Sequence, residues 1–151
     1  MSTPLALTMG DTAGIGPEIT LKVWLARRES RLPPFFLVSR ISLYDTFAAR
    51  LGLDVPCVAI RSPEETLSVF EHALPVLELP QEVVASPGKP DVADAQMIIR
   101  SIADAVELVR LGQAAAVVTN PINKSVLYQA GFGFPGHTEY LASLAANGSD
   151  V

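Results

Sequence analysis

Residues 5–19 read LALTMGDTAGIGPEI, and this stretch decides the class of fold. The apolar run at 5–9 predicts a buried β-strand, and residues 10–16 predict a glycine-rich loop. Pro17 then predicts the first turn of a helix, where a missing N–H costs nothing because the N–H groups there have no partner within the helix. A short apolar strand, a tight turn and a helix are typical of an α/β protein.

The same alternation of short apolar runs and longer amphipathic stretches continues along the chain. Strands or extended segments are predicted at 35–38, 55–60, 74–79 and 114–119, and helices at about 17–29, 43–51, 62–73 and 91–112. Asp91 is expected to cap the longest helix and Gly112 to end it. Strand 114–119 is apolar on both faces, as central parallel strands are. We therefore predict an α/β fold with an open, mostly parallel sheet and flanking helices; residues 147–151 resemble the approach to a further strand.

Composition excludes several classes of protein. The chain has 151 residues, 49% of them hydrophobic and 18% charged, with a formal net charge of −5. This composition fits one folded domain and excludes disorder, and the acidic balance argues against a nucleic-acid partner. Cys57 is the only cysteine, which excludes an internal disulfide. No apolar run approaches the roughly 18–20 residues of a membrane helix, and no signal peptide is recognisable, so we expect a soluble cytoplasmic protein without a membrane partner.

The first segment with chemical potential is GDTAGIGPE, at residues 10–18. A glycine-rich turn before a helix can direct backbone N–H groups toward an anion. It is not a Walker loop, because no Gly-Lys-Ser/Thr follows, and Ile19 replaces the third glycine of the dinucleotide fingerprint. Two interpretations remain open, an anion-binding loop and a tight structural turn.

The second segment is VTNPINKS, at residues 118–125, where a buried strand gives way to a helix. Open α/β sheets bind ligands at this end of their strands. Asn120 is expected to cap the helix, with Pro121 at its first position. Lys124, one turn further on, would then either reach an anion or remain a solvated surface lysine.

The third segment is GFGFPGHTE, at residues 131–139, with His137 and Thr138 at the start of the next helix. An imidazole and a hydroxyl beside free helix N–H groups can hold a phosphate or carboxylate, although Thr138 could serve only as an N-cap. His72 lies in a short amphipathic helix and is interpreted as a surface or packing residue. Because a metal needs three or four converging ligands and the two histidines lie in unrelated segments, no metal site is predicted in this chain.

Taken together, three blocks resemble the 4-hydroxythreonine-4-phosphate dehydrogenase family in their order and spacing: LALTMGDTAGIGPEI, VTNPINKSVLYQAGF and FPGHTEYLA. The resemblance runs from about Leu5 to Ala142 and is weaker between residues 59 and 80. Where the family usually has a proline after Gly-Asp, this chain has Thr12. Loss of proline removes a fixed φ, so we expect a looser but tolerated loop.

The resemblance implies a fold similar to that of the isocitrate and isopropylmalate dehydrogenases, with two α/β domains, an active site between them and a homodimer. Residues 1–151 would be the N-terminal portion, and the second half is absent from this chain. The implied reaction is NAD-dependent oxidative decarboxylation of 4-phosphooxy-L-threonine to 3-amino-2-oxopropyl phosphate, a step of pyridoxal phosphate (vitamin B6) biosynthesis. NADP is an alternative cofactor, and a divalent metal ion (Zn, Mg or Co) assists.

The family's GHTE block contacts substrate, which implies that His137 and Thr138 bind substrate here. Its metal-ligating histidines follow that block, so the metal ligands are expected to be absent and the isolated chain to be inactive. No catalytic or cofactor-binding residue is assigned. The alternatives are a paralogue acting on another 4-phosphorylated hydroxy acid, a non-catalytic phosphate-ligand-binding or dimerisation remnant, and an α/β domain with purely structural glycine loops.

Overall fold

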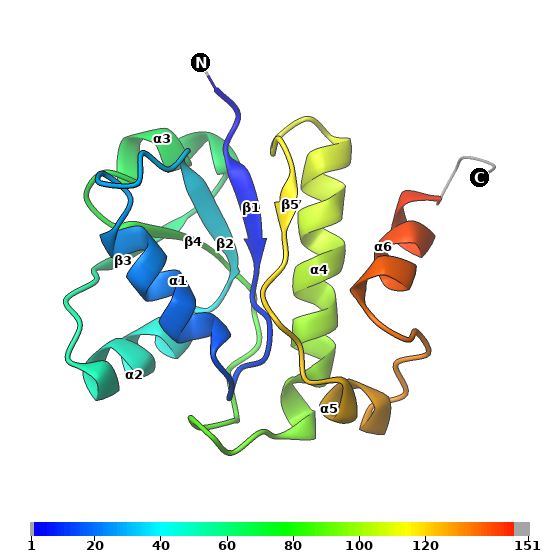
Figure 1. The fold of residues 1–151 in the computed structure, drawn as a ribbon. Coiled ribbons are helices and arrows are strands. Elements are labelled where there is room, and N and C mark those ends of the chain that lie inside the picture. Colours follow the sequence, from blue (N-terminus) through cyan, green and yellow to red (C-terminus); the bar gives the residue numbers. More distant parts are fainter. Residues whose placement is uncertain (1, 147–151) are drawn as a thin grey trace.

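The structure is a computed structural model that describes residues 2–146 (Figure 1). Its strands are β1 (Leu5–Thr8), β2 (Phe35–Ser39), β3 (Cys57–Ile60), β4 (Leu74–Glu78) and β5 (Val117–Val118). Its α-helices are α1 (Gly16–Leu25), α2 (Ile41–Leu51), α3 (Thr66–Val69), α4 (Ala95–Arg110), α5 (Lys124–Gln129) and α6 (His137–Ala145). Two 3₁₀ turns, η1 (Pro63–Glu65) and η2 (Val92–Asp94), precede α3 and α4.

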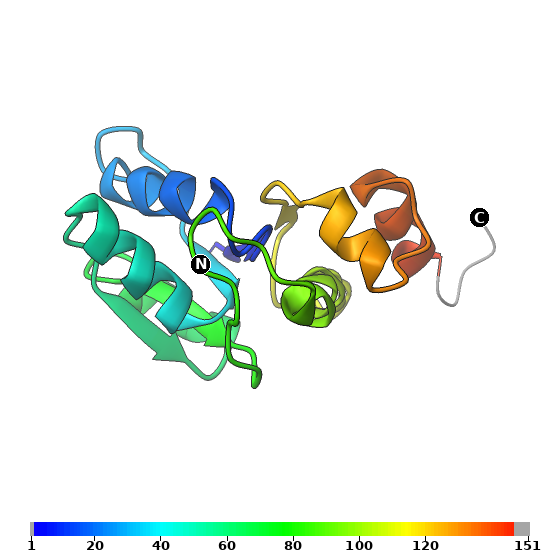
Figure 2. The same ribbon diagram turned by 90° about the horizontal axis from the view of Figure 1, so that it is seen from below.

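The strands described within residues 2–146 form one parallel sheet in the order β3-β4-β2-β1-β5. Right-handed crossovers in such a sheet place helices on opposite faces when the direction of winding reverses. Accordingly, Figure 2 shows α1 and α2 on one side of the sheet and α4 on the other, with α5 and α6 beyond α4. The predicted open, parallel α/β sheet with flanking helices is confirmed.

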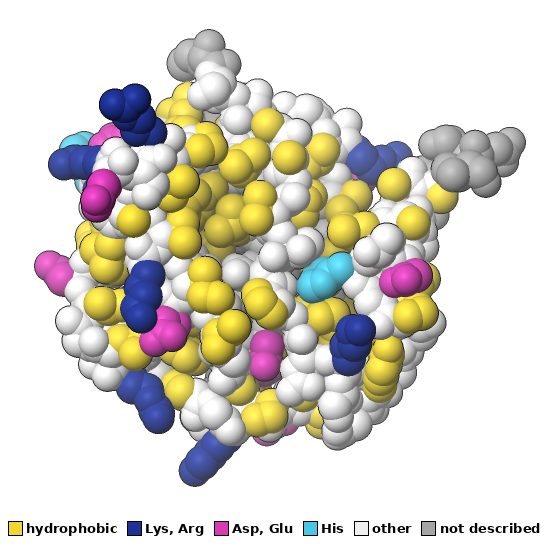
Figure 3. All heavy atoms as spheres, viewed as in Figure 1, with side chains coloured by type: hydrophobic (Ala, Val, Ile, Leu, Met, Phe, Trp, Pro, Cys, Tyr) yellow, Lys and Arg dark blue, Asp and Glu magenta, His cyan; other side chains and the backbone are white. Residues whose placement is uncertain are grey.

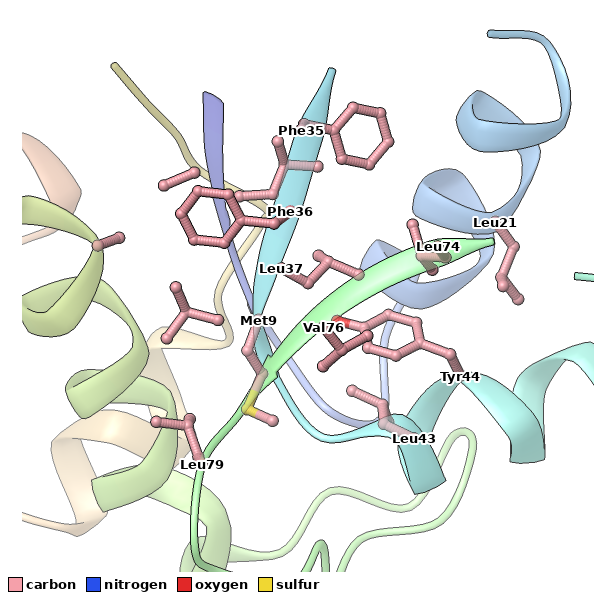
Figure 4. Close-up of a cluster of buried hydrophobic side chains, with 14 of the residues drawn as sticks. Met9, Leu21, Phe35, Phe36, Leu37, Leu43, Tyr44, Leu74, Val76 and Leu79 are labelled. Atoms are coloured by element: carbon pink, nitrogen blue, oxygen red, sulfur yellow. The ribbon is translucent and has the colours of Figure 1, made fainter. Parts of the chain in front are cut away.

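The core lies on both faces of the central strands. All five residues of β2 are buried, and consecutive side chains point to opposite faces, as a strand requires. Figure 4 shows Phe36 on the side of α4, whereas Leu43 and Tyr44 of α2 pack on the other side. The Tyr44 hydroxyl donates a 2.8 Å hydrogen bond to Ser39 Oγ, so this buried polar group is satisfied.

The two predicted ends of the longest helix, α4, are confirmed to within a few residues. The Asp91 side chain accepts a 2.9 Å hydrogen bond from the Ala93 N–H and caps η2, from which α4 continues. Gly112 follows α4 in the left-handed region, with a φ of 74°. The helix predicted at 62–73 is instead the short pair η1 and α3. Residues 147–151, predicted to approach a further strand, lie outside the described residues.

The prediction of a central strand at 114–119 is wrong for the described part of the chain. There β5 spans two residues and pairs with β1 alone, at the edge of the sheet. Ala115, Ala116 and Thr119 are exposed, and Val118 is 44% exposed. An apolar sequence on both faces suits a strand covered on both sides. In β5, these apolar side chains instead remain partly exposed at the edge of the sheet.

Among residues 2–146, no helix has both the length and the apolar character needed to cross a bilayer.

Candidate functional site

The first and second segments meet at the carboxyl ends of β1 and β5. These strands are neighbours, with Ala6 opposite Val117, so the loops that follow them emerge side by side. The Asp11 N–H donates a 2.8 Å hydrogen bond to the Pro121 carbonyl. Gly10 has a φ of 69°, and a Cβ there would lie 2.7 Å from that same oxygen. Only glycine therefore permits this close approach of the two loops.

Asn120 joins these segments from inside the protein, which corrects its predicted role as a helix cap. Its side chain is buried, and Nδ2 donates to the Thr8 carbonyl at 2.9 Å and to Thr20 Oγ1 at 3.1 Å. Its backbone N–H donates to Thr8 Oγ1 at 3.0 Å. The buried oxygens of Thr8 and Thr20 need donors, and the Asn120 amide supplies them.

The helix cap is Asn123, whose side chain accepts a 3.3 Å hydrogen bond from the Val126 N–H. The predicted position of Pro121 at the first turn is therefore wrong, because Pro121 precedes this cap. Lys124 is the first residue of α5, rather than a residue one turn into the helix. Asparagine is a favoured N-cap residue, so Asn120 and Asn123 were both possible caps. The buried side chain of Asn120 is bonded to Thr8 and Thr20, which leaves Asn123 as the cap.

The glycine-rich loop is held from several sides. Thr12 is buried and donates a 2.8 Å hydrogen bond to Oδ2 of Asp94, and the Gly88 N–H donates to the Ala13 carbonyl at 2.9 Å. Asp11 Oδ1 accepts a 3.0 Å bond from the Ala13 N–H, so the loop's own carboxylate occupies an N–H group that would otherwise face an anion. Of the two interpretations left open, the geometry favours the tight structural turn.

Asp94 is a residue that the sequence motifs did not identify. It is 1% exposed, and besides Thr12 it accepts hydrogen bonds from the backbone N–H groups of Val84 and Ala85 at 2.8 and 3.0 Å. It therefore ties the segment before α4 to the glycine-rich loop. In the sequence, Asp94 is only an acidic residue near a predicted helix start. Acidic residues are common there on any helix, so nothing in the sequence marked this role.

The third segment begins α6 at His137. Gly136 precedes it in extended backbone, and no side chain of the described residues caps this helix. Thr138 is the exposed second residue of the helix, so the interpretation of Thr138 as an N-cap is wrong. The Tyr128 hydroxyl donates a 3.1 Å bond to the Pro135 carbonyl, which fastens α5 to the loop before α6.

An aromatic cluster holds this loop against α6. The rings of Phe132, Phe134 and Tyr140 have centroid separations of 5.1–5.5 Å in edge and tilted arrangements. Both α5 and α6 also pack against α4. The start of α6 is thus supported by apolar contacts on its own segment and by the longest helix.

His137 is partly buried, and its Nε2 is fully buried with no hydrogen-bond partner among the described residues. Burial, and then the positive charge of Lys124, lower the pKa of His137 below its ordinary value. A neutral imidazole carries one N–H donor and one acceptor nitrogen. The second and third segments are thereby brought together around Lys124 and His137, while the first segment reaches them only through the second.

A separate hollow of about 380 Å³ lies between α1 and the edge formed by β1 and β5. Figure 3 shows hydrophobic side chains gathered in it on the face seen in Figure 1. Its lining is largely aliphatic and aromatic, including Leu7, Ile19, Val23, Phe35 and Val118. Such a lining does not suit a phosphorylated acid, so we do not place the anionic substrate there.

Among residues 2–146, no three histidine, cysteine, aspartate or glutamate side chains lie close enough together to hold a metal ion. The side chains around His137 therefore do not fit a metal centre, and no chemical step is assigned to one here.

Comparisons with known proteins agree with the resemblance of the three segments. The chain is 55% identical over 145 residues to the 4-hydroxythreonine-4-phosphate dehydrogenase of Methylorubrum extorquens, covering 95% of this chain and 41% of that protein. It is 47% identical to the enzyme of the same name from Bradyrhizobium diazoefficiens, covering 98% of this chain and 45% of that protein. The chain thus spans less than half the length of these curated relatives.

A solved structure shows the same fold. The 4-hydroxythreonine-4-phosphate dehydrogenase of Klebsiella pneumoniae superposes with a TM-score of 0.81 at 31% identity, covering 95% of this chain and 44% of that one. This confirms the predicted similarity to the isocitrate dehydrogenase-like fold, which these enzymes share. The family described as pyridoxal phosphate biosynthetic protein PdxA matches residues 32–151. With four-fifths of its residues inside that match and three motif segments assembled as described, this chain belongs to the PdxA family.

Proposed function

We propose that this chain is the N-terminal portion of a 4-hydroxythreonine-4-phosphate dehydrogenase of two α/β domains that acts in pyridoxal phosphate biosynthesis as a homodimer. The proposed reaction oxidises the C3 alcohol of 4-phosphooxy-L-threonine, with hydride passing to NAD or NADP. The resulting 3-oxo acid loses CO2 and takes up a proton to give 3-amino-2-oxopropyl phosphate. Membership of the PdxA family supports this proposal, together with the names of the relatives.

The proposal assigns substrate binding to His137 and Thr138. Both stand on the first turn of α6, where backbone N–H groups have no partner within the helix. The exposed Thr138 hydroxyl can donate to or accept from a substrate oxygen, and the partly buried imidazole of His137 adds a directed N–H. The observation that carries this assignment is the unpartnered, buried Nε2 of His137, because a buried polar side-chain atom normally has a hydrogen-bond partner.

The oxidation uses a nicotinamide cofactor and, by the family resemblance, a divalent metal ion. No residue of this chain is assigned to either, and the arrangement around His137 does not fit a metal. We therefore propose that these ligands are supplied by polypeptide that the relatives have and residues 1–151 do not, and that the isolated chain gives no turnover.

The test begins with the coding region that follows the codon for Val151 and with the polypeptide that the complete reading frame encodes. That polypeptide should reduce NAD when given 4-phosphooxy-L-threonine and a divalent metal ion, whereas residues 1–151 alone should not. Reduction of NAD only with a different 4-phosphorylated hydroxy acid would support the paralogue instead. No turnover by a folded, metal-loaded protein with any of these substrates would overturn the assignment.

The site assignment is tested by His137→Ala and Thr138→Val in the active protein. Each should raise KM and lower kcat/KM by about tenfold or more, as expected for a lost hydrogen bond to a charged group. His72→Ala is the matched control, because His72 is exposed in the turn between α3 and β4. An unchanged kcat/KM for His137→Ala would show that this histidine is structural.

A further inference from the structure

The cationic side chain of Lys124 lies near His137, where α5 and α6 both begin. Lys124 is the first residue of α5, and Gly136 immediately precedes α6. The Cε and Nζ atoms of Lys124 lie 3.7 and 3.8 Å from the position that a Cβ on Gly136 would occupy. The Lys124 ammonium therefore stands over the backbone that leads into His137.

The charges at this point are not balanced by an ion pair. The ion pairs found among residues 2–146 do not include Lys124 or His137. A carboxylate oxygen, Oε2 of Glu139, lies 3.6 Å from the same Cβ position on Gly136. Lys124 is exposed, so its ammonium is free to donate hydrogen bonds to a ligand at the start of α6.

Backbone N–H groups add further donors at this point. The first N–H bonded to a carbonyl at the start of α6 is that of Tyr140, which donates to Gly136 at 3.3 Å. The preceding N–H groups of the helix have no intrahelical acceptor, and no described side chain caps them. Nε2 of His137 is buried without a partner beside them. The Lys124 ammonium at the start of α5, and the His137 ring and free N–H groups at the start of α6, are thus donors from two segments of the chain.

We propose that Lys124 is a further substrate-binding residue and that it binds, together with His137 and the first turn of α6, the phosphate ester of the substrate. This inference rests on the proposed function, which supplies a phosphorylated substrate. A phosphate monoester has three terminal oxygens and nearly two negative charges near neutral pH, and it matches a donor set of this size better than a carboxylate with two oxygens does. Glu139 opposes the anion, so its charge sets how tightly the phosphate binds.

The experiment measures binding of inorganic phosphate and of acetate, by calorimetry and by shifts of the His137 ring signals in NMR spectra. It uses the complete protein and the variants Lys124→Met, Lys124→Arg and Glu139→Gln. Lys22→Met is the matched control, since Lys22 is an exposed helical lysine that pairs with Glu18 at 3.6 Å. Thermal unfolding of each variant establishes that it is folded.

Phosphate should bind the unaltered protein and shift the His137 ring signals, while acetate binds more weakly. Lys124→Met should weaken phosphate binding by about tenfold or more, as loss of a charge-assisted hydrogen bond does, and Lys124→Arg should retain most of it. Glu139→Gln should tighten it and Lys22→Met leave it unchanged. In turnover, Lys124→Met should raise KM for 4-phosphooxy-L-threonine more than it lowers kcat.

Three outcomes would overturn the inference: no phosphate binding by the unaltered protein, equal binding by folded Lys124→Met, or acetate binding as tight as phosphate binding. If 4-phosphooxy-L-threonine is turned over and KM does not respond to Lys124→Met, Lys124 has no such role while the proposed function stands. If phosphate binds through Lys124 but no phosphorylated hydroxy acid is oxidised, the proposed function fails and the anion site remains.

Discussion

The hydroxyl of Thr12 donates a 2.8 Å hydrogen bond to Oδ2 of Asp94, and both residues are almost completely buried. They stand 82 positions apart, so this bond ties the glycine-rich loop to the start of α4. At this position, where the resemblance led us to expect a proline that restricts φ, the chain has a threonine whose side chain makes a buried hydrogen bond. The hydroxyl thus restrains the loop at the position where the resemblance led us to expect a looser backbone.

Thr12→Val tests this bond, since valine keeps the shape and removes the donor. We expect the free energy of unfolding to fall by about 1–2 kcal/mol, because Asp94 loses one of its buried donors. Urea unfolding followed by circular dichroism measures the change. Thr46→Val is the control, since Thr46 is exposed on α2 and its hydroxyl bonds the Ser42 carbonyl of its own helix. Equal losses for the two variants would show that the Thr12 bond adds nothing to stability.

The close approach of the first two segments predicts a large difference between two glycines with the same backbone conformation. Gly10 and Gly112 have φ values of 69° and 74°. A Cβ on Gly10 would lie 2.7 Å from both Asn120 Cβ and the Pro121 carbonyl, whereas a Cβ on Gly112 meets nothing within 4 Å. Gly112→Ala should therefore lower the free energy of unfolding by about 1–2 kcal/mol, from the left-handed backbone alone.

Gly10→Ala should lower the free energy of unfolding by this amount and by about 1–3 kcal/mol more, the usual range for overpacking. The added loss arises because the backbone at Asn120 and Pro121 must move away from the new methyl group. The measurement is the midpoint of urea unfolding for both variants under the same conditions. If the two substitutions are equally destabilising, the loops after β1 and β5 are not in the close contact described.

The order of strands and helices could be predicted from the sequence, because each element depends on residues close to it in the chain. Short-range interactions determine the loop at Gly10, the helix cap at Asp91 and the end of the helix at Gly112. All three lie where they were predicted. The position of Asn120, by contrast, depends on contacts between distant parts of the chain. Its type and its neighbour Pro121 favour a helix cap, yet its partners are Thr8 and Thr20, more than 90 positions away.

The same limit applies to the candidate site. His137 and Thr138 could be placed at a helix start from their spacing, but their neighbour Lys124 could not, since its position depends on how α5 turns back toward α6. Asp94 was missed for the same reason, as its partners Thr12, Val84 and Ala85 come from two other segments. Long-range polar contacts are set by the packing of the whole sheet and leave no periodic signal.

The single cysteine is expected to be unreactive in the folded protein. Cys57 lies in β3 and is partly buried; burial, and then the charge of Asp45, raise the pKa of its thiol to about 12. The thiolate is the nucleophile, so almost none is present at neutral pH. Reaction with a disulfide reagent at about pH 8 should be slow in the folded protein and fast in urea, where the thiol returns to its ordinary pKa of about 8.5. Equal rates would show that Cys57 is freely accessible.

His137 should titrate below the ordinary histidine value of 6.5, because burial and the nearby Lys124 both disfavour its charged form. NMR titration of its ring protons measures this midpoint. Lys124→Met removes the like charge and should raise the midpoint, whereas Lys22→Met should leave it unchanged. A midpoint at or above 6.5, or one insensitive to Lys124→Met, would contradict the arrangement at the start of α6.

The same shift has a consequence for stability with a definite sign. Because the folded-state pKa of His137 is lowered, the unfolded chain binds more protons as the pH falls through 6.5 toward the folded-state value. His137 therefore lowers the free energy of unfolding across that window and has no such effect above it. Comparing urea unfolding of the unaltered chain and His137→Gln on both sides of the window isolates this contribution from the carboxylates that both proteins share. The unaltered chain should lose more stability on acidification than His137→Gln, and a parallel loss would mean that the His137 ring is as solvated when folded as when unfolded.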